Sequence, residues 1–217
     1  NGVYSMDCEA VTLNQLIAQS NKSNGASLNN TATIKAANCT FDGNAANGLR
    51  MDVVNKTWVT NGVYSNNGET GLAMSNVAQL SVKGPVLHSN TGYGLNIDTI
   101  NVSGLVKDAE SYNNGDIGIR YKDSLGKINT QYAKVHGNAN SGIYGVNCEN
   151  MVVNGCEVYE NAGFGINATD SPLANVKYCN VHDNKDIGVR YSGCKKIIVT
   201  DTDSCNNVNA GIYAADC

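Results

Sequence analysis

The chain has 217 residues, which is enough for one domain with a sizeable core. Its 15 Lys and Arg are outnumbered by 19 Asp and Glu, and this net charge of −4 argues against a general binder of nucleic acid or anionic membranes. No apolar run approaches the roughly 20 residues of a transmembrane helix. The 41% of apolar residues, together with abundant Asn, Gly and Ser, favours turn-rich β structure over disorder.

One motif recurs along the chain: an Asn, three variable residues, a Gly and then an aliphatic residue. Eight copies follow one another at intervals of 23 or 24 residues, and their asparagines are Asn44, Asn67, Asn90, Asn114, Asn138, Asn161, Asn184 and Asn207. One repeat length before Gly48 lies Gly25, with Asn21 at the Asn position, and another repeat length back lies Gly2. The register therefore covers residues 1–217, and we expect a single repetitive domain.

Taken in chain order, each repeat contains the same apolar alternations. Two of them precede the Asn, as in Val11/Leu13 with Leu16/Ala18, Ile34/Ala36 with Cys39/Phe41, and Met151/Val153 with Cys156/Val158. A third follows the Gly, as in Ile166/Ala168. Alternation with a period of two indicates a strand with one buried face, so the sequence predicts three short strands per repeat. No repeat can bury its inner face alone, and the sequence therefore predicts an all-β solenoid of about nine stacked coils.

Stacked coils lie about 4.8 Å apart, which places the repeated asparagines in one column. An Asn amide can donate to the coil on one side and accept from the coil on the other, so we expect an internal Asn ladder with a structural role. The Gly four residues later is expected to permit a left-handed backbone or close packing.

The repeated units "NAGFGI" (161–166) and "NKDIGV" (184–189) resemble the right-handed parallel β-helix repeat of the pectate lyase-like superfamily. The resemblance covers essentially all of residues 1–217 and implies a right-handed, single-stranded β-helix. The superfamily includes polysaccharide lyases, glycosidases, epimerases, esterases, phage tailspikes and surface fibres. The resemblance is therefore specific for fold and uninformative about activity.

A longer repeat of about 70 residues is superimposed on the coils. Arg50, Arg120 and Arg190 are spaced 70 and 70 apart, and the N-terminal "NGVYSMDC" resembles the C-terminal "AGIYAADC". The chain begins and ends within equivalent coils, and neither end shows a recognisable cap. We therefore expect a window of a longer array or an uncapped filament subunit that associates end to end. The alternative is a truncated fragment of an ordinary enzyme.

The eight cysteines suit an oxidising, extracellular setting. Cys156 and Cys179 share one phase of the repeat, and Cys194 and Cys217 share another, so adjacent coils would bring each pair within disulfide range. The alternative is a ladder of buried, reduced thiols. Zinc-type spacing is absent, and neither a metal site nor a cofactor is predicted.

Two outward rows are candidates for contact with a glycan or a partner. One row contains His88, Tyr112, His136, Tyr159 and His182, and its alternative role is stacking between coils. The other contains Tyr4, Arg50, Asn96, Arg120, Tyr144, Asn167, Arg190 and Tyr213. We expect Asp116 to pair with Arg120, and Asp186 with Arg190, as exposed salt bridges.

Six Asn-x-Ser/Thr sequons begin at Asn21, Asn29, Asn38, Asn55, Asn101 and Asn167. Asn55 and Asn101 occupy equivalent positions in a turn of the repeat and are the better candidates for N-glycosylation. Asn21, in contrast, is expected to be buried in the ladder.

No catalytic residue is predicted, because the signatures of polygalacturonases, pectate lyases and alginate epimerases are missing and no acidic dyad stands out. The favoured interpretation is a non-enzymatic extracellular or cell-surface β-helix of a filament, appendage, sheath or stalk. The alternatives are a carbohydrate-active enzyme, or a fragment of one, acting on an acidic polysaccharide, and a glycan-binding module. A polysaccharide or attached glycans are the expected contacts besides the chain itself.

Overall fold

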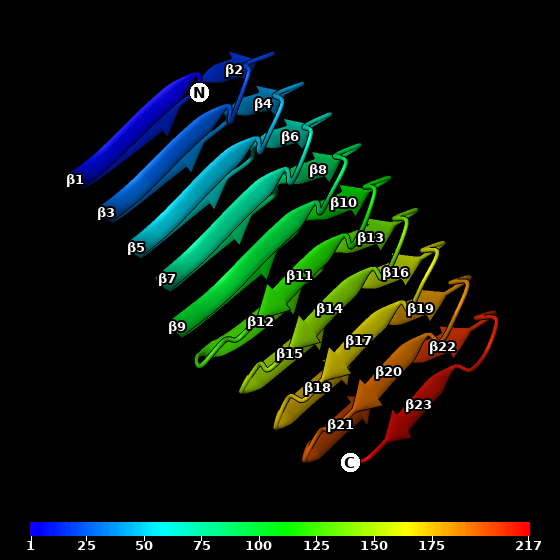
Figure 1. Ribbon diagram of the computed structural model, residues 1–217. Helices are drawn as coiled ribbons and strands as arrows, with labels where there is room; N and C mark the ends of the chain where they lie inside the picture. Colours follow the sequence, from blue (N-terminus) through cyan, green and yellow to red (C-terminus); the bar gives the residue numbers. More distant parts are fainter.

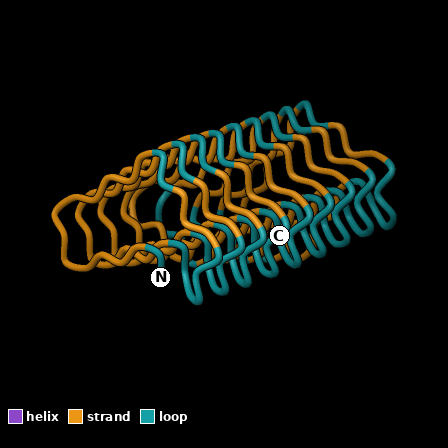
Figure 2. The backbone as a smooth tube through the Cα atoms, turned by 90° about the horizontal axis from the view of Figure 1, so that it is seen from above, coloured by secondary structure: helices purple, strands orange, loops and turns teal.

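The structure is a computed structural model that describes residues 1–217. The chain winds into a parallel β-helix of nine coils and the first strand of a tenth (Figure 1), which confirms the predicted all-β fold. The turns line up along common edges of the solenoid (Figure 2). The structure contains no helix of the length and apolar character that crossing a membrane requires.

The first five coils each contain one long and one short strand. These are β1 (Val3–Asn14), β2 (Ile17–Gln19), β3 (Ala26–Ala37), β4 (Thr40–Asp42), β5 (Leu49–Thr60), β6 (Val63–Ser65), β7 (Leu72–Lys83), β8 (Val86–His88), β9 (Leu95–Lys107) and β10 (Glu110–Tyr112).

The remaining coils contain three strands each, as the sequence predicts. They are β11 (Ile119–Lys122), β12 (Lys127–Gln131), β13 (Lys134–His136), β14 (Ile143–Val146), β15 (Asn150–Asn154), β16 (Glu157–Tyr159), β17 (Ile166–Thr169), β18 (Leu173–Lys177), β19 (Asn180–His182), β20 (Val189–Ser192), β21 (Lys196–Thr200) and β22 (Asp203–Cys205). Strand β23 (Ile212–Ala215) opens the tenth coil. Each strand pairs in parallel with its equivalents in the neighbouring coils, giving one 14-stranded and one nine-stranded sheet.

The expectation of three strands per coil is wrong for the first five coils, in which one long strand continues through a corner. Branched Val54, Val77 and Ile100 occupy this corner in coils three to five and are buried. From the sixth coil the position holds Ser or Cys, and the Ser124 hydroxyl accepts the Ile100 N–H at 3.3 Å. This contact joins the undivided β9 to the turn between β11 and β12. The residue type at the corner does not decide the division, because Cys8 holds the same position within the undivided β1.

The same corner also contains the extra residue of the two longest coils. Three residues separate Ser75 from Gln79, but four separate their partners Asp98 and Ser103 in the next coil. Four residues again separate Lys122 from Lys127, which pair with Asp98 and Ser103. The additional residues bulge outward, leaving Val102 55% and Leu125 72% exposed.

Each complete coil bends at corners with a left-handed backbone. In the second coil these corners are Asn30, Asn38 and Gly43, with φ values of 44°, 53° and 61°. Asn and Gly suit such positions because they tolerate a positive φ better than other residues.

The motif glycines have a different role, because none of them has a positive φ. A Cβ on Gly142 would lie 2.8 Å from the Gly165 carbonyl oxygen and 2.8 Å from the Asn161 amide nitrogen. Close packing between coils, rather than a left-handed backbone, therefore requires glycine here.

The Asn ladder is present. The backbone N–H and the side-chain amide of Asn44 both donate to Asn67 Oδ1, at 3.1 and 3.0 Å, and Asn67 Nδ2 donates to Asn90 Oδ1 at 2.9 Å. The pattern runs from Asn21 to Asn207. Its members from Asn44 to Asn184 are buried, whereas Asn21 is half-buried rather than buried as expected.

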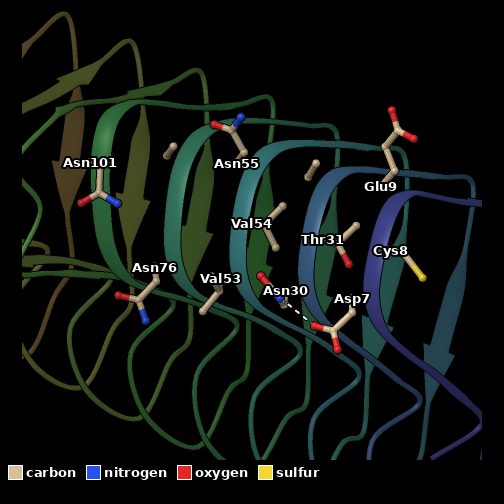
Figure 3. A pocket seen from close by; sticks show the side chains of 12 residues that line it. Asp7, Cys8, Glu9, Asn30, Thr31, Val53, Val54, Asn55, Asn76 and Asn101 are labelled. Carbon is tan, nitrogen blue, oxygen red and sulfur yellow. Dashed lines mark hydrogen bonds between the residues drawn. The ribbon is translucent and has the colours of Figure 1, made fainter.

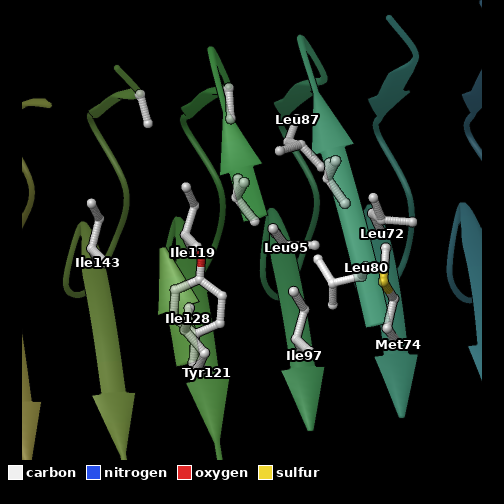
Figure 4. Close-up of a cluster of buried hydrophobic side chains, with 14 of the residues drawn as sticks. Leu72, Met74, Leu80, Leu87, Leu95, Ile97, Ile119, Tyr121, Ile128 and Ile143 are labelled. Atoms are coloured by element: carbon white, nitrogen blue, oxygen red, sulfur yellow. The ribbon is translucent and has the colours of Figure 1, made fainter. Parts of the chain in front are cut away.

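Columns of aliphatic side chains fill the interior (Figure 4). Leu72, Leu95, Ile119 and Ile143 occupy equivalent positions in successive coils and have no solvent exposure. Burial of such side chains drives stacking of the coils, because each contributes about 1.5–3 kcal/mol.

Candidate functional site

Five aromatic rings form one column on the outer face of the nine-stranded sheet. His88, Tyr112, His136, Tyr159 and His182 lie in the order that the repeat predicts. Successive ring centroids are 4.9, 5.2, 4.7 and 5.1 Å apart, and the interplanar angles are 3° to 8°. We call these five residues the ring column.

The column uses its own ring faces for stacking, because each inner ring is covered on both sides by its neighbours. A sugar that stacks on an aromatic face could therefore reach only the free faces of the terminal rings, His88 and His182. The inner rings present edges to solvent, with the imidazole nitrogens and phenolic hydroxyls as polar groups. This geometry favours a stacking role, and contact with a glycan or partner stays a prediction.

A row of charged side chains lies beside the ring column. Lys134 Nζ lies 3.8 Å from Glu157 Oε2 and 5.5 Å from the Tyr159 ring centroid, while His136 Nε2 lies 4.0 Å from Glu110 Oε1. Partial burial lowers the pKa of His136, and the Lys134 charge acts in the same direction, outweighing the nearby carboxylates. His136 is therefore held in its neutral form to a lower pH than a solvated imidazole.

These acidic and basic groups do not line any hollow. The five hollows in the surface are lined by residues of other faces. The ring column and its charged neighbours therefore form an open surface, where water screens their electrostatic interactions.

The second outward row lies on the first half of the long strands and continues on β11, β14, β17, β20 and β23. Arg120 Nη1 donates to Asn96 Oδ1 at 2.6 Å and to Asp98 Oδ1 at 2.8 Å, and Arg190 Nη1 donates to Asn167 Oδ1 at 3.2 Å. The expected pairs Asp116–Arg120 and Asp186–Arg190 are therefore wrong.

Both aspartates are engaged on the turn instead. Asp116 accepts from Asn140 Nδ2 at 3.0 Å, and Asp186 accepts from Asn209 Nδ2 at 2.7 Å. Each of these contacts joins consecutive coils, so the aspartates face the next turn rather than the arginine of their own coil.

Each of these arginines also stacks on an aromatic ring of the preceding coil, a contact that the sequence analysis missed. The guanidinium carbon of Arg120 lies 5.3 Å from the Tyr93 ring centroid, and that of Arg190 lies 5.2 Å from Phe164. In the coil that follows each arginine, the strand neighbour of Arg120 is Tyr144 and that of Arg190 is Tyr213. The sequence feature that could have predicted these contacts is the aromatic residue directly before the motif Gly, Tyr93 or Phe164.

The predicted disulfides Cys156–Cys179 and Cys194–Cys217 are not formed, and all eight cysteines are free thiols. The sulfurs donate to backbone carbonyl oxygens instead: Cys156 Sγ lies 3.6 Å from Asn154 O, and Cys179 Sγ lies 3.2 Å from Lys177 O. The neighbouring Cys179 thiol and burial together raise the pKa of Cys156 well above the ordinary thiol value. The alternative interpretation, a ladder of buried thiols, describes this pair.

The largest hollow is an open groove along one corner of the first five coils (Figure 3). It has a volume of about 590 Å³. Amide side chains dominate its polar lining: Asn30, Asn55, Asn76 and Asn101, with Asp7 at one end. Of these side chains, only Asn55 and Asn101 were expected from the sequence to matter, as sequons. Both are exposed, and their glycosylation stays a prediction.

Comparisons with known proteins agree with this architecture. A family model described as "Right handed beta helix region" matches residues 1–146 and 133–217. No curated protein matches the sequence. Similar solved structures include a mutant of the periplasmic alginate epimerase AlgG, with a TM-score of 0.66, 14% identity and coverage of 89% of this chain and 60% of that chain.

Two further structures extend this similarity. The A-module of the Azotobacter vinelandii mannuronan C-5 epimerase AlgE6 has a TM-score of 0.60 and 14% identity, over 98% of this chain and 61% of that chain. Tailspike protein 2 of the Escherichia coli bacteriophage CAB120 has a TM-score of 0.63 and 12% identity, over 99% of this chain and 33% of that chain. The chain therefore spans about 60% of each epimerase chain and a third of the tailspike.

Proposed function

Because this chain belongs to the right-handed β-helix family, we propose that it is a non-enzymatic structural β-helix of an extracellular or cell-surface filament, appendage, sheath or stalk. One observation carries the proposal: the Asn ladder continues without interruption through coils of 23 or 24 residues. No coil departs from the stack to build a loop over a face.

This regularity suits a mechanical role. Hydrogen bonds of the strands and of the ladder run along the axis, so every coil is tied to the next by backbone and side-chain contacts. A catalytic cleft usually needs loops that enclose the substrate and exclude water, and the outer faces of this solenoid remain open. The similarity to a phage tailspike is consistent with a rigid surface structure, although a tailspike and two epimerases share the same fold.

Electron microscopy of the undenatured full chain tests the proposal. Nine coils of about 4.8 Å give a rod of roughly 45 Å, so uniform rods many times longer would establish the predicted end-to-end association. Discrete short particles at all concentrations would contradict the filament.

The enzyme alternative has its own test. Incubation with uronate polymers, with and without Ca²⁺, followed by analysis of chain length and epimer composition, detects a lyase, a glycosidase or an epimerase. Turnover of any of these polymers would replace the structural proposal with a carbohydrate-active enzyme.

A glycan-binding module is a second candidate, favoured by the surroundings of Arg190. This arginine stacks on Phe164, adjoins Tyr213 and has no carboxylate within 4 Å. Loss of glycan retention in Arg190→Ala, without loss in Arg50→Ala, would support this role.

A further inference from the structure

Lysines gather on one outer side of the solenoid, although the chain as a whole is acidic. We define the lysine face as the outward residues on the second halves of β1, β3, β5, β7 and β9 and on β12, β15, β18 and β21. Alternate residues of these segments point inward and are mostly buried, as Ile34 and Ala36 are in β3. The outward residues include seven of the twelve lysines, namely Lys35, Lys56, Lys83, Lys107, Lys127, Lys177 and Lys196.

No carboxylate balances these charges on the face itself. Its nine segments contribute three outward positions each, and none of these positions is Asp or Glu. Only Lys107 makes an ion pair, with Asp108 at the bordering corner, 3.9 Å away. Lys83 and Lys107 pair directly in neighbouring strands, where like charges repel.

The lysines extend along the axis. Coils two to six each contribute one, and the five lysines occupy three neighbouring columns: Lys56 and Lys127 in one, Lys35 in the next, and Lys83 and Lys107 in the third. A polymer with many anionic groups matches a charged band that crosses five coils better than a compact anion does.

The surface between the lysines has the chemistry of a sugar contact. Trp58 is 42% exposed on this face, and Lys35 Nζ lies 5.8 Å from its ring centroid. A hollow of about 390 Å³ is lined by Lys35, Trp58 and Thr60, and one of about 290 Å³ includes Lys127, Asn129 and Gln131. Aromatic rings offer sugars an apolar platform, and side-chain amides both donate to and accept from hydroxyl groups.

We infer that the lysine face is a binding surface for an anionic polysaccharide whose carboxylate or sulfate groups lie along the coil axis. Nucleic acid fits less well, because proteins that bind single strands interleave several aromatic rings for the bases and Trp58 is the single tryptophan of the chain. The inference does not depend on the structural role proposed above, since a filament that binds no glycan would contradict this inference alone.

The test measures binding of the full chain to polygalacturonate, dextran sulfate, neutral dextran, duplex DNA and anionic phospholipid vesicles. Trp58 provides a built-in signal, because tryptophan fluorescence reports from this face alone. We expect an acidic glycan to change Trp58 fluorescence, and added salt to reverse the change. Preference between the two acidic glycans identifies the anionic group.

Two triple variants with equal loss of charge locate the surface. Lys56→Gln, Lys83→Gln and Lys127→Gln together should weaken binding about tenfold. Lys22→Gln, Lys122→Gln and Lys185→Gln, on other faces, should leave it within about twofold. The inference would be overturned by equal weakening of glycan binding in both variants or by tighter binding to DNA or vesicles than to the acidic glycans. Unchanged Trp58 fluorescence in the unmodified chain would also overturn it, and this measurement does not depend on the folding of a variant.

Discussion

The His136 ring lies parallel to the Tyr159 ring, with centroids 4.7 Å apart and an interplanar angle of 8°. The two side chains come from successive short strands, so their stacking depends on the register of the coils. Because His136 is the central ring of the column, its protonation and its substitution test the column directly.

Stability should fall as the pH drops through the range in which the unfolded His136 gains a proton. Burial lowers the pKa of this imidazole below its usual 6.5, so the unfolded chain binds the proton more tightly than the folded chain. The stabilising contribution is thus fully present above pH 6.5 and is lost as the pH falls through the lower, folded pKa. Urea unfolding between about pH 7.5 and about pH 5 measures the loss.

His136→Tyr provides the matched variant, because Tyr holds the same phase at Tyr112 and Tyr159. It should keep the stacking and flatten the pH dependence in this range. An unchanged pH profile in the variant would show that another group, rather than His136, produces the dependence.

Removing one ladder amide should destabilise the whole stack. Asn138 Oδ1 accepts both the N–H and the side-chain amide of Asn114, at 3.1 and 2.9 Å. Asn138→Ala therefore leaves the buried Asn114 N–H without a partner and removes one acceptor of its side-chain amide. We expect the free energy of unfolding to fall by roughly 3 kcal/mol in urea titrations. Asn140→Ala, which removes an exposed contact with Asp116 and a 3.4 Å contact with the Ser141 hydroxyl, should change it by less than about 0.5 kcal/mol. Similar losses in the two variants would contradict a special role for the ladder.

Alkylation should distinguish exposed from buried thiols. Cys205 and Cys217 are exposed, whereas Cys148 and Cys156 are buried, and burial raises the pKa of Cys148 to about 11. Because the thiolate reacts, iodoacetamide should label Cys205 and Cys217 first and reach the buried pair only after unfolding.

Intact mass and peptide mapping before and after denaturation give the order of labelling. The same mapping should be done on protein purified from an oxidising compartment. A disulfide-linked Cys156–Cys179 peptide in that protein would contradict the free thiols and support the disulfide predicted from the repeat. Rapid labelling of Cys156 in the folded chain would contradict the packing.

The two equivalent arginines should differ in their sensitivity to salt. Arg120 contacts the Asp98 carboxylate at 2.8 Å, whereas the equivalent position beside Arg190 is Thr169. Arg120→Ala should cost about 1 kcal/mol of unfolding free energy at low salt and less at high salt, and Arg190→Ala should cost about half as much with little salt dependence. Thermal unfolding at two ionic strengths separates the cases, and equal salt dependence would argue against the Asp98 contact as the cause.

Much of this architecture could be predicted from the sequence, because the repeat length sets which residues stack on one another. A constant interval predicts which residues share a column, and the Asn ladder and the ring column from His88 to His182 both depend on that alone. The orientation of a side chain within its column does not follow from the interval. Arg120 turns towards Asp98 in the preceding coil, and the five rings turn their faces to one another, which spacing cannot specify.

The corner of the long strands shows a second limit. The strand continues there in the first coil, where the inward residue is Cys8, and divides in the seventh, where it is Cys148, so the residue type at this position does not predict the division. A period-two alternation looks the same in both cases. The lysine face does not follow from the interval either, because its lysines hold three different positions of the repeat and meet only on the folded surface.

The bulge at Val102 and Leu125 shows where this architecture tolerates change. Both additional residues enter at one corner, and the strands on either side still pair in register. An insertion there grows sideways, so the distance between any two coils stays the same. The solenoid can therefore acquire new surface at this corner without becoming longer and without changing the spacing of its coils.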